Sequence, residues 1–202
     1  EILDIDPGEK VIALTFDDGY EDNFRVVLPI LLRLGVSATF YLSTKFIAYG
    51  ENTSSETGNK LYPNRRMMCA TQIRSLLDAG MEIGSHGHSH ELLGKMSFED
   101  QRRELDESIR VLKNMFNVDV KSFSYPNGQR GAFSSEFNRY VLRNTDLLVL
   151  TTLWQTLGTV RIQGRCEMAA EDSFSEFISK IHGRRDYRFI LDRLLKKSNA
   201  WL

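Results

Sequence analysis

Short apolar runs that favour β-strands alternate with amphipathic helical segments along most of the chain, and this alternation limits the folds available to it. The strand-forming runs are residues 11–16, 38–43, 81–86, 121–126 and 147–152, with one or two more within 159–168. The helical segments are residues 22–34, 71–80, 97–116, 134–144, 173–183 and 187–197. Strands that alternate with helices pack as a parallel sheet covered by those helices. The pattern therefore predicts an α/β fold, either an open parallel sheet or a barrel.

The length of 202 residues is enough for one substantial core and short for two. Because no internal repeat and no linker divides the chain, we expect a single domain over residues 1–202. Residues 45–68 are polar and rich in Gly, Asn and Ser, which predicts a long exposed loop, and residues 173–197 form the C-terminal helices. Pro29 lies inside the helical pattern of 22–34 and predicts a kink or local break, since proline has no backbone N–H.

Composition excludes several classes of function. With 26 basic and 27 acidic residues, the chain offers no strong electrostatic case for nucleic-acid binding. No apolar run approaches the roughly 20 residues of a membrane-spanning helix. Two cysteines, Cys69 and Cys166, are too few for a disulfide framework, and they either form one bridge or stay as thiols. The chain begins at Glu1 rather than Met, so we expect residues upstream of it; cytoplasmic and cell-envelope locations both stay open, as does the oligomeric state.

Polar motifs follow three of the predicted strands. Asp17 and Asp18 come directly after the first strand, and residues 86–90 (HGHSH) follow the third with three of the four histidines in the chain. Residues 125–128 (YPNG) close the fourth strand. In parallel α/β folds the carboxyl ends of the strands lie at one edge, where active residues gather. We therefore expect the three motifs to form one site.

The residue types at this edge suit a divalent metal ion. Imidazole and carboxylate groups are ligands of zinc, and a turn through Gly87 would bring the rings of His86 and His90 together. One aspartate would complete a set of two histidines and one carboxylate, which leaves positions open for water and substrate. Adjacent side chains of an extended chain point to opposite sides, so the other aspartate would face the bound water as a base.

Each motif alone has a simpler interpretation. Residues 17–19 (DDG) and 125–128 (YPNG) are typical of turns, and the histidine segment is compatible with a polar loop. The joint occurrence of the motifs at three strand ends is what favours a metal site.

The motifs also carry a family resemblance. Residues 15–19 (TFDDG) and 84–90 (GSHGHSH) match the first and second motifs of the polysaccharide deacetylase family, and residues 123–128 (FSYPNG) resemble its third. These proteins are metal-dependent carbohydrate esterases that include chitooligosaccharide deacetylases. The resemblance runs from about Val11 to about Thr152, and more loosely to Gly183.

The resemblance implies a distorted, incomplete β/α barrel of about seven strands. It implies that Asp18, His86 and His90 hold a divalent metal, zinc first, with Co, Ni, Mn or Fe as alternatives. The implied reaction is hydrolysis of an N-acetyl, less often O-acetyl, group on an amino-sugar glycan or an activated sugar. In it, Asp17 is the base for a metal-bound water that attacks the acetyl carbonyl, and the backbone amide of Asn127 helps to stabilise the oxyanion.

Residues around these motifs are candidates for contacts with the sugar. We expect substrate contacts at Tyr20, Tyr125, Pro126 and Asn127. The rings of Tyr20, Tyr125 and Trp154 either stack on a sugar ring or belong to the core. His88 takes a variable position between the ligands, where it is either an outer partner of the site or solvated.

The chain departs from the family pattern in its third motif, in its fourth, where Trp154 is a poor match to the aromatic–acidic pair, and in its C-terminal motif. Many members carry an arginine where this chain has Ser124; a branch with a small residue there carries a later arginine, for which Arg165 is the candidate and Arg161 the second. Each is equally compatible with an ordinary surface arginine. The C-terminal leucine–histidine motif that supplies a general acid is not evident, and His182 suits the C-terminal end of a helix, so the general acid is unassigned.

Two other functions stay open. The chain would otherwise be a sugar-binding module without hydrolysis, or a metal-dependent amidase acting on a non-sugar amide. The presence of Asp17 argues against the first, because a binding module has no use for a base beside the metal. The sequence does not define the sugar: chitin, peptidoglycan, an exopolysaccharide and a lipid- or nucleotide-linked sugar are all compatible with it.

Overall fold

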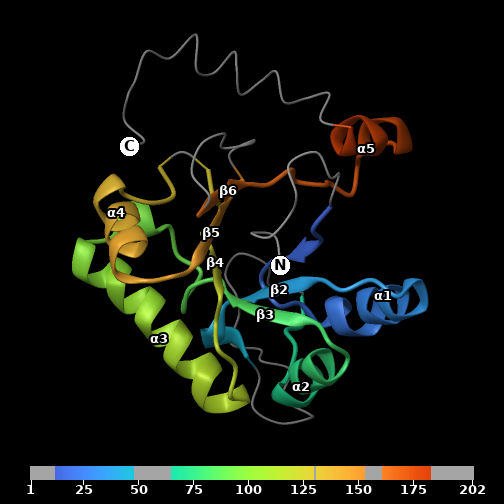
Figure 1. The fold of residues 1–202 in the computed structure, drawn as a ribbon, viewed down its shortest axis with the longest axis horizontal. Coiled ribbons are helices and arrows are strands. Elements are labelled where there is room, and N and C mark those ends of the chain that lie inside the picture. The colour runs from blue at the N-terminus through green and yellow to red at the C-terminus, as the bar shows by residue number, and fades with distance from the viewer. Residues whose placement is uncertain (1–11, 48–64, 130, 153–160, 183–202) are drawn as a thin grey trace. The chain divides into compact units, whose positions relative to one another are not determined.

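The computed structural model describes residues 12–47, 65–129, 131–152 and 161–182 (Figure 1). These residues belong to two compact units, the first comprising Glu1–Glu91 and Arg102–Ser124, the second Leu92–Gln101 and Tyr125–Leu202. The predicted helix 187–197, most of the predicted loop 45–68, and Trp154 lie outside the described residues. The single domain expected over residues 1–202 stays a prediction.

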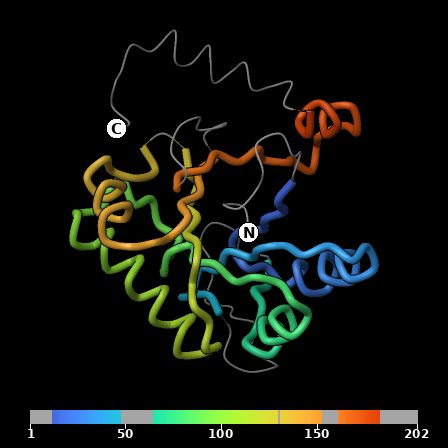
Figure 2. Tube along the Cα trace, in the orientation of Figure 1, coloured from blue at the N-terminus to red at the C-terminus, as the bar shows by residue number. Residues whose placement is uncertain are grey.

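Four parallel strands form the sheet of the first unit. They follow one another in chain order and are β1 (Thr15–Phe16), β2 (Thr39–Leu42), β3 (Glu82–Ser85) and β4 (Ser122–Ser124). β2 and β3 pair over their whole length, from Thr39 opposite Glu82 to Leu42 opposite Ser85, and Figure 2 shows their traces side by side. Because the strands are parallel, the residues that follow each of them lie at the same edge of this sheet.

The helices of the first unit connect these strands. A π-helical turn (Asn23–Val27) continues into α1 (Leu28–Leu34), a short 3₁₀ turn (Thr44–Phe46) follows β2, and α2 (Ala70–Asp78) precedes β3. The long helix α3 (Phe98–Phe116) leads into β4. The unit's core is built from apolar side chains of the strands and the inner faces of α2 and α3, among them Phe40, Leu42, Ile73, Leu76, Ile83, Leu105, Leu112 and Phe123.

The break predicted at Pro29 is confirmed. The N–H of Leu28 donates to the carbonyl of Asn23, five residues back, and regular α-helix begins only at Leu28. Pro29 therefore lies just after the π-helical turn, a local irregularity of the kind that proline causes in a helix. Gly35 ends the helix with a φ of 65°, a left-handed conformation that glycine adopts without steric cost.

The second unit contains a 3₁₀ turn (Leu93–Lys95), α4 (Ser135–Asn144), β5 (Leu148–Thr151), β6 (Ile162–Gly164) and α5 (Phe174–Ile181). β5 and β6 pair in parallel, so the expected strand within 159–168 is present, and the described residues contain six strands against about seven expected. The core of this unit surrounds Tyr125, whose ring stacks on Phe133 at 4.0 Å and meets Phe137 edge-on. Among the described residues, no helix combines the length and apolar character needed to cross a bilayer.

The packing beside β3 requires a glycine at position 84, because there is no space for a side chain there. A Cβ atom at Gly84 would lie 2.3 Å from Cε1 of Tyr41, a distance that no real contact allows. Tyr41 is itself buried, and its hydroxyl donates to Oγ of Ser122 at 2.9 Å. The space beside β3 is thus filled by the tyrosine ring.

Replacing Gly84 with alanine is expected to lower the free energy of unfolding by about 2 kcal/mol, within the range for overpacked cores. Chemical denaturation of the purified variant measures this loss. In a Tyr41→Leu background the same substitution should cost less, because the smaller side chain removes the clash. Strictly additive losses in the two backgrounds would contradict the proposed steric cause.

Candidate metal centre

Asp18 lies at the centre of a tight turn that follows β1. The N–H of Gly19 donates to the carbonyl of Asp17 at 3.0 Å, and φ at Asp18 is 73°, as expected for a γ-turn with a left-handed central residue. Such a conformation costs a non-glycine residue on the order of 1–3 kcal/mol. The carbonyl of Gly19 accepts the N–H of Met68 at 2.9 Å, which helps to hold the turn in place.

Adjacent aspartates would point to opposite sides only if the chain stayed extended, and this condition does not hold here, because the backbone reverses at Asp18. An oxygen of Asp17 lies 3.8 Å from Nε2 of His86, and an oxygen of Asp18 lies 3.3 Å from the same nitrogen. Both carboxylates therefore face one imidazole.

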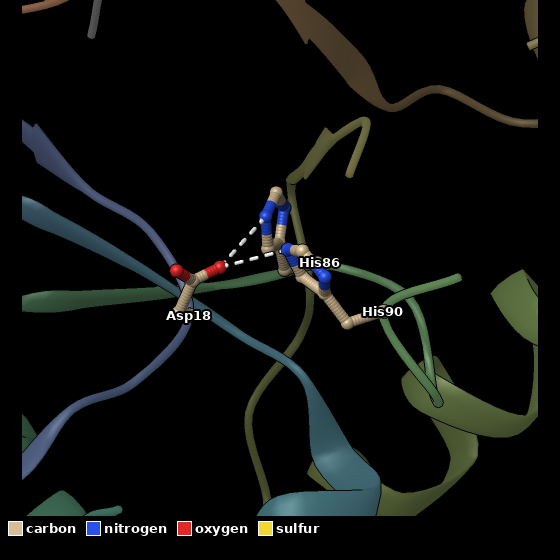
Figure 3. A group of neighbouring side chains, drawn as sticks. All are labelled: Asp18, His86 and His90. Atoms are coloured by element: carbon tan, nitrogen blue, oxygen red, sulfur yellow. Dashed lines mark ion pairs between the residues drawn. The ribbon is translucent and has the colours of Figure 1, made fainter. Parts of the chain in front are cut away.

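The structure brings Asp18, His86 and His90 together, as Figure 3 shows. Oδ1 of Asp18 lies 3.3 Å from Nε2 of His86 and 2.9 Å from Nε2 of His90. The two rings are 5.0 Å apart, and one ligand atom from each residue lies within 4.8 Å of the others. One carboxylate and two imidazoles from two strand ends are a donor set that suits a divalent transition metal and leaves further coordination positions open.

The surroundings of His86 fix which of its nitrogens faces the cluster. Nδ1 lies 2.8 Å from the carbonyl oxygen of Ser124, and because a carbonyl only accepts, Nδ1 carries a proton and donates it. Nε2 is thereby directed toward Asp18 and can serve as the metal-binding atom. A carbonyl that orients a ligating histidine in this way is a common feature of metal sites.

The electrostatics of the cluster favour a cation. Burial by itself lowers the pKa of His86, but the carboxylates of Asp17 and Asp18 outweigh it and raise that pKa above its ordinary value. Burial by itself raises the pKa of Asp18, yet hydrogen bonds and charge from His86 and His90 hold it well below its ordinary value. Asp18 is therefore an anion at neutral pH, ready to pair with a proton on the imidazoles or with a metal ion in its place.

Asp17 lies beside the ligand cluster and has a hydroxyl partner. Oγ of Ser124 donates to Oδ2 of Asp17 at 3.2 Å. Ser124 stands where the resemblance gives many family members an arginine, so in this chain a neutral donor contacts the carboxylate from that position. The side chain of Asp17 is 27% exposed, which leaves it accessible from solvent.

The third histidine of the segment, His88, has a different partner. Its Nδ1 lies 2.9 Å from Oγ1 of Thr44, in the turn that follows β2. The backbone of the segment pairs with the same turn, because Thr44 N–H donates to Gly87 and Lys45 N–H donates to His88. His88 thus attaches the segment to the neighbouring strand end, and it is not part of the ligand cluster.

Two aromatic residues expected to contact a sugar lie in the core instead. The ring of Tyr125 is fully buried against Phe133, and its hydroxyl donates to Asn138 at 3.2 Å. Tyr20 is 8% exposed, and the guanidinium of Arg65 lies 5.1 Å above its ring. Neither ring is open for stacking on a sugar, so of the two alternatives for these rings the core position is the one observed.

The other residues of the third motif form a turn in the second unit. Pro126 is buried, whereas Asn127 is exposed and has a φ of 60°. Thr152 holds this turn, since its hydroxyl donates to the carbonyl of Asn127 and its N–H to that of Gly128. A Cβ atom at Gly128 would lie 2.6 Å from the nitrogen of Thr152, so this close approach requires glycine.

The two candidate arginines also belong to the second unit, and they differ in their contacts. The guanidinium of Arg161 donates to the carbonyls of Leu142, Thr145 and Leu147, and so it satisfies carbonyls at the C-terminal end of α4. These hydrogen bonds give Arg161 a structural role. Arg165 follows β6, where its backbone N–H donates to Thr151, and it stays the candidate for a catalytic role.

The remaining candidates have simple explanations. His182 is the C-cap residue of α5, a position that suits the helix dipole as expected. Cys69 and Cys166 are both free thiols.

The structure thus presents a parallel α/β unit with a candidate set of metal ligands at its strand ends. Residues 4–148 match the model of the family described as polysaccharide deacetylase, and the chain belongs to that family. The family resemblance inferred from the three motifs is thereby confirmed.

Similar proteins are known from bacteria. The putative polysaccharide deacetylase YxkH of Bacillus subtilis is 29% identical over 123 residues, which cover 61% of this chain and 39% of that protein. The peptidoglycan-N-acetylmuramic acid deacetylase PdaA of the same species is 26% identical over 176 residues, which cover 86% of this chain and 57% of PdaA. This chain spans less than two thirds of the length of each curated relative that it matches.

A solved structure shares the fold. The Streptococcus pyogenes deacetylase PplD, determined in complex with acetate, superposes with a TM-score of 0.69 at 22% identity, covering 87% of this chain and 72% of PplD. At this level of identity the likeness establishes the fold alone. It confirms the predicted α/β class, with the incomplete barrel of the family.

We expect the chain to bind one Zn²⁺ ion, and we expect His90→Ala to weaken that binding by more than about 100-fold, because loss of a direct ligand exceeds the effect of losing its outer partners. Isothermal titration with Zn²⁺ after chelator treatment measures the affinity and the stoichiometry. His88→Ala is the matched control, since it removes a histidine from the same segment without removing a ligand. Equal affinities of the two variants would contradict the assigned ligand set.

Proposed function

We propose that this chain is a metal-dependent hydrolase that removes N-acetyl, less often O-acetyl, groups from an amino-sugar-containing glycan or activated sugar. The observation that carries the proposal is the position of Asp17, a solvent-accessible carboxylate beside the cluster of Asp18, His86 and His90. A metal site without a neighbouring base would serve binding equally well. A base next to the ligand cluster is the arrangement that hydrolysis requires.

The residues present fit a divalent ion, for which zinc is our first choice and Co, Ni, Mn or Fe are alternatives. Asp18, His86 and His90 would hold it. When bound, the ion supplies Lewis-acid chemistry, because it polarises a carbonyl and lowers the pKa of a water molecule.

The residues around the ligands have separate tasks. Asp17 takes a proton from the attacking water, and the hydroxyl of Ser124 holds the carboxylate in place for this transfer. The carbonyl of Ser124 keeps His86 in the tautomer with Nε2 toward the cluster. The family resemblance further implies that the backbone amide of Asn127 stabilises the oxyanion, and it makes Arg165 the candidate for the role of the missing third-motif arginine.

The class of substrate follows from the family. The relative PdaA is named as a deacetylase of N-acetylmuramic acid in peptidoglycan, which supports an N-acetylated amino sugar as the substrate here. Chitin, peptidoglycan, exopolysaccharide and lipid- or nucleotide-linked sugars all present this group. A panel of these substrates, with N-acetylated non-sugar amides included, identifies the one that releases acetate.

Asp17→Asn is expected to reduce acetate release by about 10²- to 10⁴-fold, the usual contribution of a general base, while zinc affinity stays within a few-fold of wild type. The measurement is acetate release across the substrate panel, paired with zinc titration of the same preparations. If the wild-type chain binds zinc and glycan but releases no acetate from any substrate, the sugar-binding alternative replaces this proposal. Release only from non-sugar amides would instead support an amidase.

Arg165→Ala is expected to lower kcat by about 10-fold or more with little change in the free energy of unfolding, as for loss of one electrostatic contact in a transition state. Arg161→Ala provides the matched comparison. It should lower the free energy of unfolding by about 2 kcal/mol, because charged, part-buried hydrogen bonds to three carbonyls are lost, and should leave kcat of the folded protein unchanged. Steady-state kinetics and denaturation curves of both variants separate the two roles; the reverse pattern would contradict the assignment of Arg165.

A further inference from the structure

We propose that Glu104 of α3 is a positioning residue for the metal ligand His90. The inference rests on the proposed metal-dependent function and adds a residue that belongs to none of the three motifs. Its carboxylate binds the backbone between the two histidine ligands, and through that backbone it sets the direction of the second imidazole.

The carboxylate of Glu104 accepts three hydrogen bonds from the segment of residues 86–90. Oε2 of Glu104 accepts the N–H of His88 at 2.9 Å and the N–H of Ser89 at 2.7 Å. Oε1 accepts the hydroxyl of Ser89 at 2.8 Å. The two residues that directly precede His90 are thus bound to Glu104, 15 and 16 positions further along the chain, by charge-assisted hydrogen bonds, which are the stronger kind.

His90 needs such support because its backbone is strained. The chain must reverse between His86 and His90 for both rings to reach Asp18, and it does so with a φ of 76° at Gly87 and 61° at His90. Glycine adopts this conformation freely, but a histidine does so at a cost in free energy. Contacts that fix the preceding peptide groups keep His90 in this conformation.

The ring of His90 also lacks the support that His86 has. Nδ1 of His86 is hydrogen-bonded to the carbonyl of Ser124, whereas Nδ1 of His90 is buried and has no hydrogen-bond partner within the described part of the chain. Apart from the contact of Nε2 with Asp18, the direction of the His90 ring is therefore set by its backbone. Glu104 holds the peptide groups immediately before it.

Further hydrogen bonds fix the position of residues 86–90 relative to Glu104. One helical turn after it, Ser108 hydrogen-bonds Oγ of Ser85, the last residue of β3, and the same oxygen of Ser85 accepts the N–H of Gly87. On the opposite side, the turn after β2 pairs with the carbonyls of Gly87 and His88. The segment is held from both sides, and Glu104 provides the charged contact.

The test compares Zn²⁺ affinity in the full chain for wild type, Glu104→Ala and Glu104→Gln. Removing the carboxylate should raise the zinc dissociation constant by about 10- to 100-fold, as found for outer partners of metal ligands. Glutamine keeps the volume and one carbonyl oxygen but loses the charge, so an intermediate loss is expected. The visible absorption spectrum of the Co²⁺-substituted protein should change in Glu104→Ala, because it reports the ligand geometry.

Glu107→Ala is the matched control. Glu107 lies on the same helix one turn further on, is partly exposed, and pairs with Arg110. Its removal should leave both the zinc affinity and the cobalt spectrum unchanged, which separates a specific effect on the site from a general effect on α3.

Three results would overturn the inference. Unchanged zinc affinity and cobalt spectrum in a folded Glu104→Ala would do so, as would an equal loss in Glu107→Ala. Where Glu104→Ala does not fold, Glu104→Gln decides: weaker binding supports the inference, and wild-type binding refutes it. If the wild-type chain itself binds neither Zn²⁺ nor Co²⁺, the proposed function fails as well, so failure of the inference alone is recognised by normal wild-type binding.

Discussion

The ligand cluster depends on the parallel pairing of β1, β2 and β3. The pairs Phe16 with Phe40 and Leu42 with Ser85 fix how far the chain after β1 stands from the chain after β3. Slipping one strand by one residue would move its end by about 3.3 Å and turn its side chains to the other face. That displacement is as large as the 2.9 to 3.3 Å that separate the ligand atoms of Asp18 from those of the histidines. The register of the sheet therefore has to be established before a site can exist, and the tight fit of Tyr41 against β3 is one of the contacts that establishes it.

Regular strands alone do not complete the cluster, and the missing geometry is supplied by left-handed residues. Both Asp18 and His90 have positive φ, and each is flanked or closely preceded by a glycine that shares the reversal. Strain of this kind persists only where surrounding contacts outweigh it, and such positions concentrate at functional sites. Here the contacts are backbone hydrogen bonds from Met68 to the turn after β1 and from the turn after β2 to the histidine segment. The sheet positions the turn after β1 and the segment after β3, and these local reversals direct the side chains of Asp18 and His90 toward each other.

The sequence predicts a feature of the fold or the site well when that feature depends on residues that are close together in the chain. The strands, the helices and the break at Pro29 are visible in the order of residues, because periodicity and backbone chemistry act over short distances. The histidines and the aspartate pair were equally accessible, since residue chemistry and the strand-end rule point to them, whereas the choice of Asp18 over Asp17 came from the family resemblance. The burial of Tyr125 depends on Phe133 and Phe137, whose packing no pattern around the motif reveals. The role of Glu104 was missed for a similar reason, although one signal was present: it lies beside the buried positions Leu105 and Ser108 on the inner face of α3, where a carboxylate is unusual and needs a partner.

Ser124 contacts the proposed metal ligand His86 and the proposed base Asp17 through two different groups. Its carbonyl orients His86, a task that any residue at this position performs, because every residue has a carbonyl. Its hydroxyl contacts Asp17, a task that depends on the side chain. Exchange of arginine for serine at this point of the third motif therefore leaves the orientation of the ligand intact and changes only the partner of the base. The proposed ligands come from the sequence motifs, while contacts of neighbouring elements with the ring of His86 and with the backbone before His90 orient them, so the partner of the proposed base can change without disturbing these contacts.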